Sequence, residues 1–242
     1  MRIQPIILAA GKGTRMGNPD LPKVLQPLKG KPLISYLLKT LDQTPFLKPA
    51  LVVGFRHELV REAVGPDYRY IHQEEQRGTA DAILCCAKEL QGTADAFLIM
   101  CGDQPLWKAV TIENLVAKHE EEKAVLSLAT VVSNYPSFEA FGRILRSPEG
   151  ALIGMREFKN CTPEEKAINE YNPSLFCCSD SWLWDALRRV QPSAPSNEYY
   201  FTDIVSFAVE EHRKVATSSV VDWQETLGVN TPDQLAEVSS YL

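Results

Sequence analysis

The sequence predicts an α/β fold in which a mostly parallel sheet carries helices on both faces. Short apolar runs alternate with helical patterns along the first half of the chain, and a glycine-containing loop follows the first apolar run. Right-handed crossovers between such strands place helices on both sides of the sheet. With 242 residues, 45% of them hydrophobic, the chain is long enough to bury a sizeable core.

The first half of the chain supplies strands and helices in regular order. Apolar runs predict strands at 6–10, 51–54, 68–72, 96–100 and 125–131. Helical patterns separate these strands, at 32–41, 57–64, 79–90 and 112–121.

From Ser133 onward the pattern changes. Two apolar runs, 141–145 and 151–155, flank the turn sequence SPEG and predict a hairpin inserted beside the sheet. After a charged segment at 162–166 we expect a strand at 171–178, helices at 180–190 and 198–210, and a strand at 215–221. Thr231 followed by Pro232 indicates the start of a last helix, because Thr is a favoured N-cap and Pro fits the first helical turn.

Composition excludes several classes of protein. The net charge of −6 argues against general binding to nucleic acid or acidic membranes, which reward a positive surface. No segment approaches the roughly 20 apolar residues of a membrane span, and the N-terminus is too short and interrupted for a signal peptide, so we expect a cytoplasmic protein. The six cysteines lack C-x-x-C spacing and the four histidines are scattered, so a zinc site has little support and the thiols are expected to be reduced and mostly buried.

The stretch LAAGKGTRMGNPDLPKVL, residues 8–25, has the features of a backbone cradle for a polyphosphate. Gly11 and Gly13 allow a sharp turn in which N–H groups converge on an anion. Positive charge comes from Lys12, Arg15 and Lys23. A basic surface loop without a ligand is the alternative.

Two better known glycine loops fit this stretch poorly. The G-x-x-x-x-G-K-[ST] pattern is absent, and Met16 occupies the third glycine position of G-x-G-x-x-G. No acidic residue ends the next strand, which runs into Phe55 and Arg56. NAD binding is therefore not expected.

Eight motifs, in order along nearly the whole chain, resemble the sugar-1-phosphate nucleotidyltransferases. They are LAAGKGTRM with PKVL, QEEQRGTADAI, CGDQPL, FGRILR, REFK, EYN, NEYYFTDI and GVNTPDQL. They resemble most closely the uridyltransferase (pyrophosphorylase) domain of the bacterial bifunctional enzymes that make UDP-N-acetylglucosamine. The resemblance implies a Rossmann-like sheet with a small inserted β-rich sugar-binding lobe, the nucleotide-diphospho-sugar transferase fold. We expect one domain, 1–242, with a nucleotide-binding half at 1–132 and the sugar-binding lobe and C-terminal helices at 133–242.

The resemblance also implies the reaction. A Mg²⁺-dependent enzyme would transfer a uridylyl group from UTP to a sugar 1-phosphate, with N-acetylglucosamine 1-phosphate as the expected acceptor, and release pyrophosphate. The acceptor phosphate is already ionised at neutral pH, so alignment and relief of charge repulsion are the enzyme's tasks. The scarcity of histidine clusters is consistent with such chemistry.

Asp103 and Asn230 are the candidate metal ligands. Asp103 follows a buried strand at its carboxyl end, where open α/β sheets place their ligands, although it could equally cap the turn before Pro105. Asn230 could equally be a turn residue. The resemblance implies that the two side chains hold one Mg²⁺, an ion that suits oxygen ligands from one or two side chains together with phosphate and water.

Arg15 and Lys23 are the candidate catalytic residues. The resemblance assigns Lys23, a mobile point charge, to the α-phosphate and Arg15, a planar fork, to the departing pyrophosphate, while the role of Lys12 stays open. The other predicted nucleotide-binding residues are Leu8, Ala9, Ala10, Gly11, Gly13, Gln73, Gly78, Thr79, Cys101, Gly102 and Asp103.

The resemblance assigns base recognition to Ala10, Gln73 and Gly78. The Gln73 amide both donates and accepts, so it could pair with the adjacent carbonyl and N–H of uracil, and thymine could satisfy the same bonds. The missing side chain of Gly78 would let the backbone approach the ring, and Thr79 is expected to cap the following helix.

The predicted sugar-binding residues are Gly142, Glu157, Asn172 and Thr202. Glu157 and Lys159 are expected on one face of a strand, so a carboxylate for hydroxyls and an ammonium for phosphate are conceivable. For Lys159 an exposed cross-strand salt bridge is the preferred interpretation. Tyr199 and Tyr200 are candidates to close the pocket, although packing is the commoner role of aromatic residues at a helix start.

Two departures from the family pattern leave the sugar open. Cys101 stands where the family usually has Tyr, and Pro173-Ser174 stands where it usually has Thr-Gly. The chain ends soon after its last predicted helix, so we expect no acetyltransferase β-helix and no acetyl transfer. Oligomeric state also stays open, with a homo-oligomer among the options.

Three alternative functions remain. One is the same chemistry with dTTP, another nucleoside triphosphate or another sugar 1-phosphate. Another is cytidylyl transfer to a small phosphorylated alcohol, which FGRILR and EYN disfavour. The third is a non-catalytic nucleotide-sugar sensor, which the complete set of Arg15, Lys23, Asp103 and Asn230 disfavours.

Overall fold

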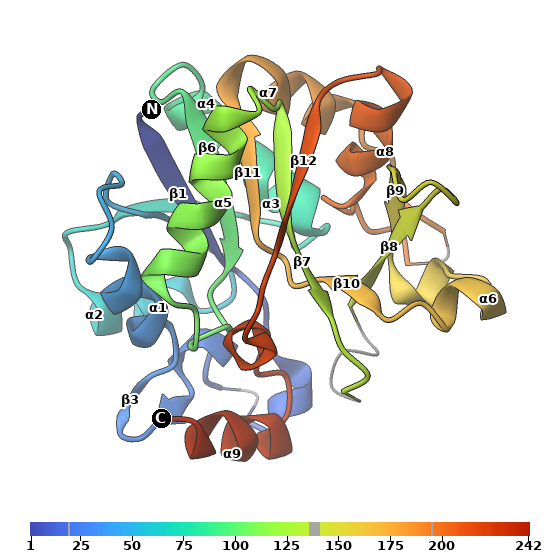
Figure 1. Cartoon of the computed structure of the whole chain (residues 1–242). Helices are drawn as coiled ribbons and strands as arrows, with labels where there is room; N and C mark the ends of the chain where they lie inside the picture. Colours follow the sequence, from blue (N-terminus) through green and yellow to red (C-terminus); the bar gives the residue numbers. More distant parts are fainter. Residues whose placement is uncertain (19, 136–140, 195) are drawn as a thin grey trace.

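The strands form one long mixed sheet in the computed structural model, which describes residues 1–18, 20–135, 141–194 and 196–242 (Figure 1). The strands of this sheet are β1 (Ile3–Ala9), β4 (Ala50–Val53), β5 (Arg69–His72), β6 (Ala96–Cys101), β7 (Leu126–Val132), β8 (Gly142–Arg146), β9 (Leu152–Arg156), β10 (Glu170–Asn172), β11 (Phe176–Ser179) and β12 (Val215–Ser219). Their order is β5-β4-β1-β6-β11-β7-β10-β8-β9, and β12 pairs with β7. A separate small ribbon pairs β2 (Pro27–Leu28) with β3 (Lys31–Pro32).

The sheet is parallel through β5, β4, β1 and β6 and mostly antiparallel toward the edge that β8 and β9 form. β1 pairs in parallel with β4 and β6, β4 with β5, and β7 with β12. β11 runs antiparallel between β6 and β7, and β8 and β9 form the predicted hairpin. The predicted mostly parallel mixed sheet is therefore confirmed.

Helices cover both faces of this sheet, as predicted. The α-helices are α1 (Ile34–Leu41), α2 (His57–Val64), α3 (Thr79–Leu84), α4 (Ala87–Leu90), α5 (Ala109–Glu121), α6 (Pro163–Lys166), α7 (Asp180–Arg189), α8 (Asp203–Glu210) and α9 (Pro232–Ser240). Short 3-10 helices are η1 (Thr14–Met16), η2 (Lys23–Leu25), η4 (Phe158–Asn160) and η5 (Trp223–Thr226).

Alternate side chains of β6 show how the two layers form. Leu98 and Met100 belong to a buried cluster with residues of α1, α2, α5 and α9. Phe97 and Ile99 point the other way, into a cluster with residues of α3, α7 and α8. The apolar run at 96–100 is thus buried on both faces, which explains why the sequence shows no polar alternation there.

Two predicted helices differ from the structure. The helix expected at 79–90 divides into α3 and α4, because the Cys86 N–H bonds to the Ile83 carbonyl three residues back and tightens the turn. The helix expected from residue 198 begins only at Asp203. The Tyr199 backbone instead bonds Arg77 O at 2.8 Å and Ala80 N at 3.0 Å, which holds this segment against the start of α3.

The strand expected at 171–178 is interrupted. β10 ends at Asn172 and β11 begins at Phe176. Between them Pro173 has no N–H to give to a neighbouring strand, and Ser174 adopts a left-handed conformation with φ 58°. The Asn172 side-chain oxygen accepts a hydrogen bond from Ser174 N at 2.9 Å and stabilises this kink.

Other expectations are confirmed. Thr231 caps α9, with its hydroxyl accepting from Gln234 N at 3.2 Å. The six cysteines are free thiols, four of them buried and two half-buried. Over the described ranges, no helix combines the length and the apolar character that crossing a membrane requires.

Candidate active site

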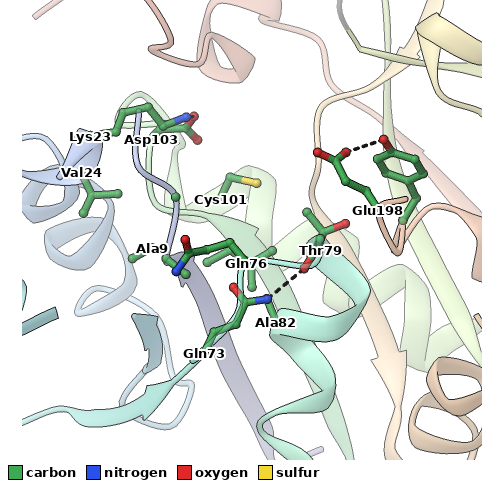
Figure 2. Close-up of a pocket in the computed structure, with 15 residues that line it drawn as sticks. Ala9, Lys23, Val24, Gln73, Gln76, Thr79, Ala82, Cys101, Asp103 and Glu198 are labelled. Carbon is green, nitrogen blue, oxygen red and sulfur yellow. Dashed lines mark hydrogen bonds and ion pairs between the residues drawn. The ribbon is translucent and has the colours of Figure 1, made fainter. Parts of the chain in front are cut away.

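A first hollow lies beside the carboxyl ends of β1 and β6 and the start of α3 (Figure 2). Its volume is about 280 Å³, near the lower end of the range for small-molecule sites. Residues predicted from the sequence make up most of its lining: Leu8, Ala9, Ala10, Gly11, Lys23, Gln73, Gly78, Thr79, Cys101 and Asp103.

A second hollow of about 390 Å³ adjoins the first. It extends from the end of β6 to β8, β10 and the segment before α9. The predicted residues in its lining are Arg15, Lys23, Thr79, Cys101, Asp103, Gly142, Glu157, Asn172, Thr202 and Asn230. Lys23, Thr79, Cys101, Asp103 and Tyr200 line both hollows, so the two share a wall.

At the shared wall, charged and polar groups that are far apart in sequence come together, and Arg15 and Asn230 reach this point from the second hollow. Lys23 Nζ contacts Asp103 Oδ2 and donates to Asn230 Oδ1 at 2.9 Å. Arg15 also donates to Asn230 Oδ1, at 3.1 Å. The two predicted metal ligands and the two predicted phosphate-binding cations therefore meet at one point.

Backbone contacts explain this convergence. Gly102 N bonds Leu8 O at 2.9 Å, which places Asp103 immediately beyond the paired ends of β1 and β6. Val229 N bonds Asp103 O at 2.9 Å, and Gln234 Oε1 accepts from Asn230 N at 2.8 Å. These bonds bring the segment before α9 across to the sheet.

Gly13 acts on the site without lining either hollow. Its φ of 66° is left-handed, and a Cβ there would lie 2.6 Å from Lys23 Cβ. The glycine therefore permits the close approach of Lys23. Gly102 likewise lies outside both linings, whereas Gly11 lines the first hollow with nothing within 4 Å of an added Cβ.

The donor set in the shared wall fits Mg²⁺. Asp103 Oδ2 and Asn230 Oδ1 both contact the same ammonium, so two oxygen atoms point to one place. Within the described residues no group of three or more His, Cys, Asp and Glu side chains could hold a metal ion. A set of one or two protein oxygens is typical of Mg²⁺ sites that phosphates and water complete.

Gln73 is held differently from the sequence-based expectation. The side chain is only 3% exposed, and its Nε2 donates to Gly78 O at 3.2 Å and to Asp81 Oδ2 at 2.8 Å. Both amide hydrogens are engaged by the protein itself. Only the oxygen is left for a ligand in the first hollow.

Gly78 and Thr79 also have physical roles that the sequence did not reveal. An added Cβ at Gly78 would lie 2.4 Å from Tyr199 O, and its φ is 127°, so the glycine permits the backbone of 199 to pass. Thr79 is not the N-cap expected from the sequence: it is the first residue of α3, and its hydroxyl accepts from Phe201 N at 2.9 Å.

Glu157 and Lys159 do not share a strand face, contrary to the prediction. β9 ends at Arg156, and η4 follows Glu157 directly. Glu157 accepts from Thr202 Oγ1 at 2.9 Å, and burial raises the pKa of its carboxyl. Lys159 Nζ lies 3.2 Å from Glu198 Oε2, so its salt bridge is with the segment before α8.

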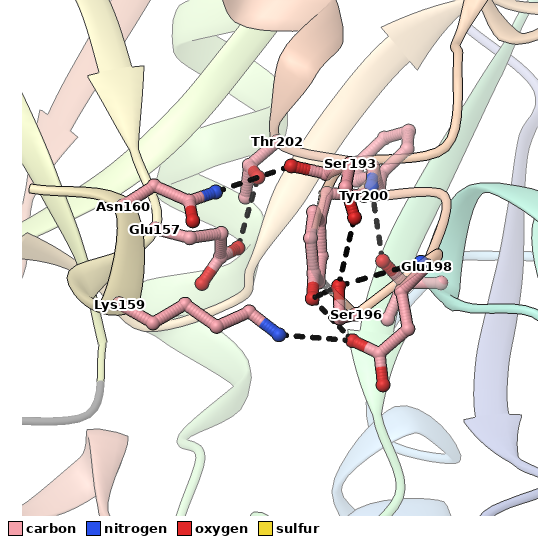
Figure 3. A network of polar contacts seen from close by, with 10 residues as sticks. Glu157, Lys159, Asn160, Ser193, Ser196, Glu198, Tyr200 and Thr202 are labelled. Atoms are coloured by element: carbon pink, nitrogen blue, oxygen red, sulfur yellow. Dashed lines mark hydrogen bonds and ion pairs between the residues drawn. The ribbon is translucent and has the colours of Figure 1, made fainter.

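A polar network joins η4 to that segment (Figure 3). Besides the Lys159–Glu198 pair, Asn160 Nδ2 donates to Ser193 Oγ at 3.3 Å, and Tyr200 OH contacts both Ser196 Oγ and Glu198. These contacts fix Tyr200 in the wall between the hollows. Asn172, 1% exposed, is fixed by its own bond to Ala129 O at 2.8 Å.

Several lining residues were missed by sequence reasoning. Gln76 and Glu198 line the first hollow, and Gln104 lines the second, whereas Tyr200, a predicted candidate to close the pocket, lines both. Gln76 stands within the QEEQRGT motif and Glu198 within NEYYFTDI, so motif membership was the available signal.

Comparison with known proteins assigns the class. Residues 5–190 match the sequence profile of the MobA-like NTP transferase domain. The chain belongs to this family and is an enzyme of the nucleotidyltransferase class.

Curated relatives show which members of the family the chain resembles in sequence. The "Bifunctional protein GlmU" of Brevibacillus brevis is 36% identical over 241 residues, which are 100% of this chain and 52% of that protein. The protein of the same name from Desulfotalea psychrophila is 35% identical over 232 residues, 96% of this chain and 68% of the relative. The chain thus spans about half the length of the Brevibacillus relative and two thirds of the other.

Solved structures share the fold. A UDP-glucose pyrophosphorylase complexed with UDP-glucose matches with a TM-score of 0.77 at 17% identity, covering 100% of this chain and 98% of that one. A putative glucose-1-phosphate thymidylyltransferase from Bacillus anthracis matches with a TM-score of 0.78 at 19% identity, covering 99% and 94%. The fold and family expected from the motifs are therefore confirmed.

Proposed function

We propose that the chain transfers a uridylyl group from UTP to a sugar 1-phosphate, with N-acetylglucosamine 1-phosphate as acceptor, and that the reaction depends on Mg²⁺. The observation that carries the proposal is the wall shared by the two hollows, where Lys23, Asp103, Asn230 and Arg15 meet. Two phosphorylated substrates in adjoining hollows would approach each other there. The eight motifs and the similarity to the GlmU relatives over nearly the whole chain support this choice of substrates.

In the proposed reaction, an oxygen of the acceptor phosphate forms a bond to the α-phosphorus of UTP. The bond from that phosphorus to the oxygen bridging to the β-phosphate breaks, and pyrophosphate leaves with the electron pair. No proton has to be removed from the acceptor. Lys23 and Arg15 hold the phosphates in line and offset their repulsion.

Asp103 and Asn230 would hold the metal ion. When bound, Mg²⁺ supplies positive charge to the phosphate oxygens. The uracil would lie in the first hollow near Gln73 and Gly78, and the sugar in the second, near Gly142, Glu157, Asn172 and Thr202. The division into a nucleotide-binding half and a sugar-binding lobe is part of the same proposal, as are the cytoplasmic location and any homo-oligomer.

One experiment tests the proposal. Pyrophosphate release is measured for UTP, dTTP, CTP, ATP and GTP, each against several sugar 1-phosphates and a small phosphorylated alcohol, with and without Mg²⁺. We expect the highest kcat/KM with UTP and N-acetylglucosamine 1-phosphate, and loss of turnover without the metal. Turnover with every base except uracil would overturn the proposal and favour a different transferase. No turnover despite tight binding of a nucleotide sugar would also overturn it and favour the non-catalytic sensor.

A further inference from the structure

Asp81 does not line the first hollow, but its side chain accepts a hydrogen bond from Gln73, which does line it. It lies in the first turn of α3, and its side chain is 11% exposed. Its Oδ2 accepts from Gln73 Nε2 at 2.8 Å, while its Oδ1 accepts from Arg77 at 2.7 Å. Each carboxylate oxygen thus has a separate partner, and Arg77 holds the group in place.

The two partners of the Gln73 amide decide which way it faces. Asp81 and the Gly78 carbonyl can only accept hydrogen bonds, so both require the amide nitrogen on their side. A flipped amide would place its oxygen against two acceptors. The Gln73 backbone is also fixed, because its N–H bonds Val53 O at 2.8 Å and continues the pairing of β5 with β4.

The consequence is a hydrogen-bond acceptor of fixed direction in the first hollow. The Gln73 oxygen takes part in no hydrogen bond with the described part of the chain, and Figure 2 shows the amide nitrogen on the side of α3 with the oxygen turned away from it. Uracil and thymine carry an N–H at ring position 3 that such an acceptor can bind. Cytosine carries a lone pair at that position, which would face the oxygen unfavourably.

We propose that Asp81 is a positioning residue that sets the base preference of the enzyme by holding the Gln73 oxygen toward the base. The preference is for a pyrimidine with a ring N–H over cytosine. This inference rests on the proposed function for the identity of the nucleotide, and it adds a residue and a physical cause for base choice.

The test is the ratio of kcat/KM for UTP to kcat/KM for CTP. Asp81→Ala frees the amide to rotate, so we expect the ratio to fall by about tenfold, the effect of one hydrogen bond, mainly through a higher KM for UTP. Glu75→Ala is the matched control, because Glu75 also pairs with Arg77, at 3.8 Å, but does not contact Gln73. It should leave the ratio unchanged.

A double-mutant cycle separates positioning from a general structural effect. In a Gln73→Leu background, adding Asp81→Ala should not change the ratio further, because the group that Asp81 holds is gone. Equal loss with UTP and CTP, or the same fall of the ratio in both backgrounds, would overturn the inference.

A second pair of variants keeps a polar side chain of the same size at position 81, so that the start of α3 is not disturbed. Gln73→Glu places a carboxylate against Asp81 and should lower kcat/KM for UTP by about tenfold or more. Adding Asp81→Asn supplies a donor and should recover part of that loss. No recovery would contradict the inference.

Failure of the proposed function gives a different result. If the wild-type protein releases no pyrophosphate from UTP, the proposed reaction is wrong, and calorimetric titration with UTP and CTP then measures the same preference as a ratio of Kd values. Equal ratios for wild type and Asp81→Ala in that titration would overturn the inference on its own.

Discussion

Lys23 and Asp103 of the shared wall and Arg15 and Asn230 of the second hollow depend on one another for the balance of charge at this point. Lys23 and Arg15 both donate to the same oxygen of Asn230, and Lys23 also pairs with Asp103, whose side chain is 12% exposed. Removal of the one carboxylate would leave two cations facing a neutral amide. A divalent ion would then lose its only anionic protein ligand within this group.

Asp103→Ala should therefore reduce Mg²⁺-dependent kcat by about 100-fold or more while the fold stays intact, because charge stabilisation at the reacting phosphate is lost. Steady-state pyrophosphate release with a Mg²⁺ titration measures this, alongside a thermal unfolding curve. Asp95→Asn is a suitable control, since Asp95 precedes the opposite end of β6 and bonds only backbone there, at Arg2 N. A near-normal rate for Asp103→Ala would count against the metal assignment.

At the scale of secondary-structure elements, the sequence predicted best where the local apolar pattern alone decides. The strand at 96–100 is present because its continuous apolar run is buried on both faces, and the helix at 57–64 because its apolar residues recur with the helical period. The expected helix start at 198 was wrong because long-range backbone bonds decide there, and the unbroken strand at 171–178 was wrong because of a local kink. Tyr199 pairs with Arg77 and Ala80, and the Asn172 side chain fixes a kink at Ser174.

The same distinction holds for the site. Motif resemblance found the residues of the shared wall, and the structure brings Lys23, Asp103 and Asn230 together. The motifs did not show in which direction any of these side chains points. The engagement of both Gln73 amide hydrogens, and the position of Glu157 beyond β9, follow only from three-dimensional contacts.

The contact of Gly78 with the segment before α8 predicts a specific cost. In Gly78→Ala, the added side chain strains a backbone with positive φ and clashes with Tyr199 O. In Gly92→Ala, the backbone strain is the same in kind, but no described atom lies within 4 Å of the added Cβ. We expect about 1 kcal/mol of destabilisation for Gly92→Ala and about 3 kcal/mol for Gly78→Ala. Urea unfolding measures both. Equal losses would show that the backbone contact at 199 contributes nothing.

His119 joins α5 to two strands and makes stability depend on pH. The ring is 1% exposed; Nδ1 lies 2.8 Å from Ser127 Oγ and Nε2 lies 3.1 Å from Ser179 Oγ. Because the Ser179 hydroxyl already donates to Ala124 O, Nε2 carries the proton and Nδ1 accepts from Ser127. Burial lowers the pKa of His119 from 6.5 to about 4.

Between these two pKa values the unfolded chain binds the proton and the folded chain does not. The free energy of unfolding should therefore fall as pH decreases through this window, by about 3 kcal/mol from this group at pH 4. His119→Gln cannot titrate, so its unfolding free energy should fall less over the same range. Urea unfolding at pH 7, 6, 5 and 4 compares the two proteins, and parallel pH profiles would refute the assignment.

In the whole molecule, both hollows lie at one end of the sheet. β1 and β6 supply the first hollow, β8 and β10 contribute to the second, and the segment before α9 closes the wall between them. Residues 15, 23, 103 and 230 come together because β1 pairs with β6 and because Val229 bonds Asp103. The central claim is that a divalent ion and the substrate phosphates meet at this point.

The most direct test is a crystal structure of the protein with Mn²⁺ and UDP-N-acetylglucosamine, in which the metal is located by its anomalous scattering. We expect one metal peak in contact with Asp103 and Asn230 oxygens, next to the diphosphate, with the uracil in the first hollow. A nucleotide bound elsewhere, or a metal bound to the diphosphate away from those two side chains, would contradict it.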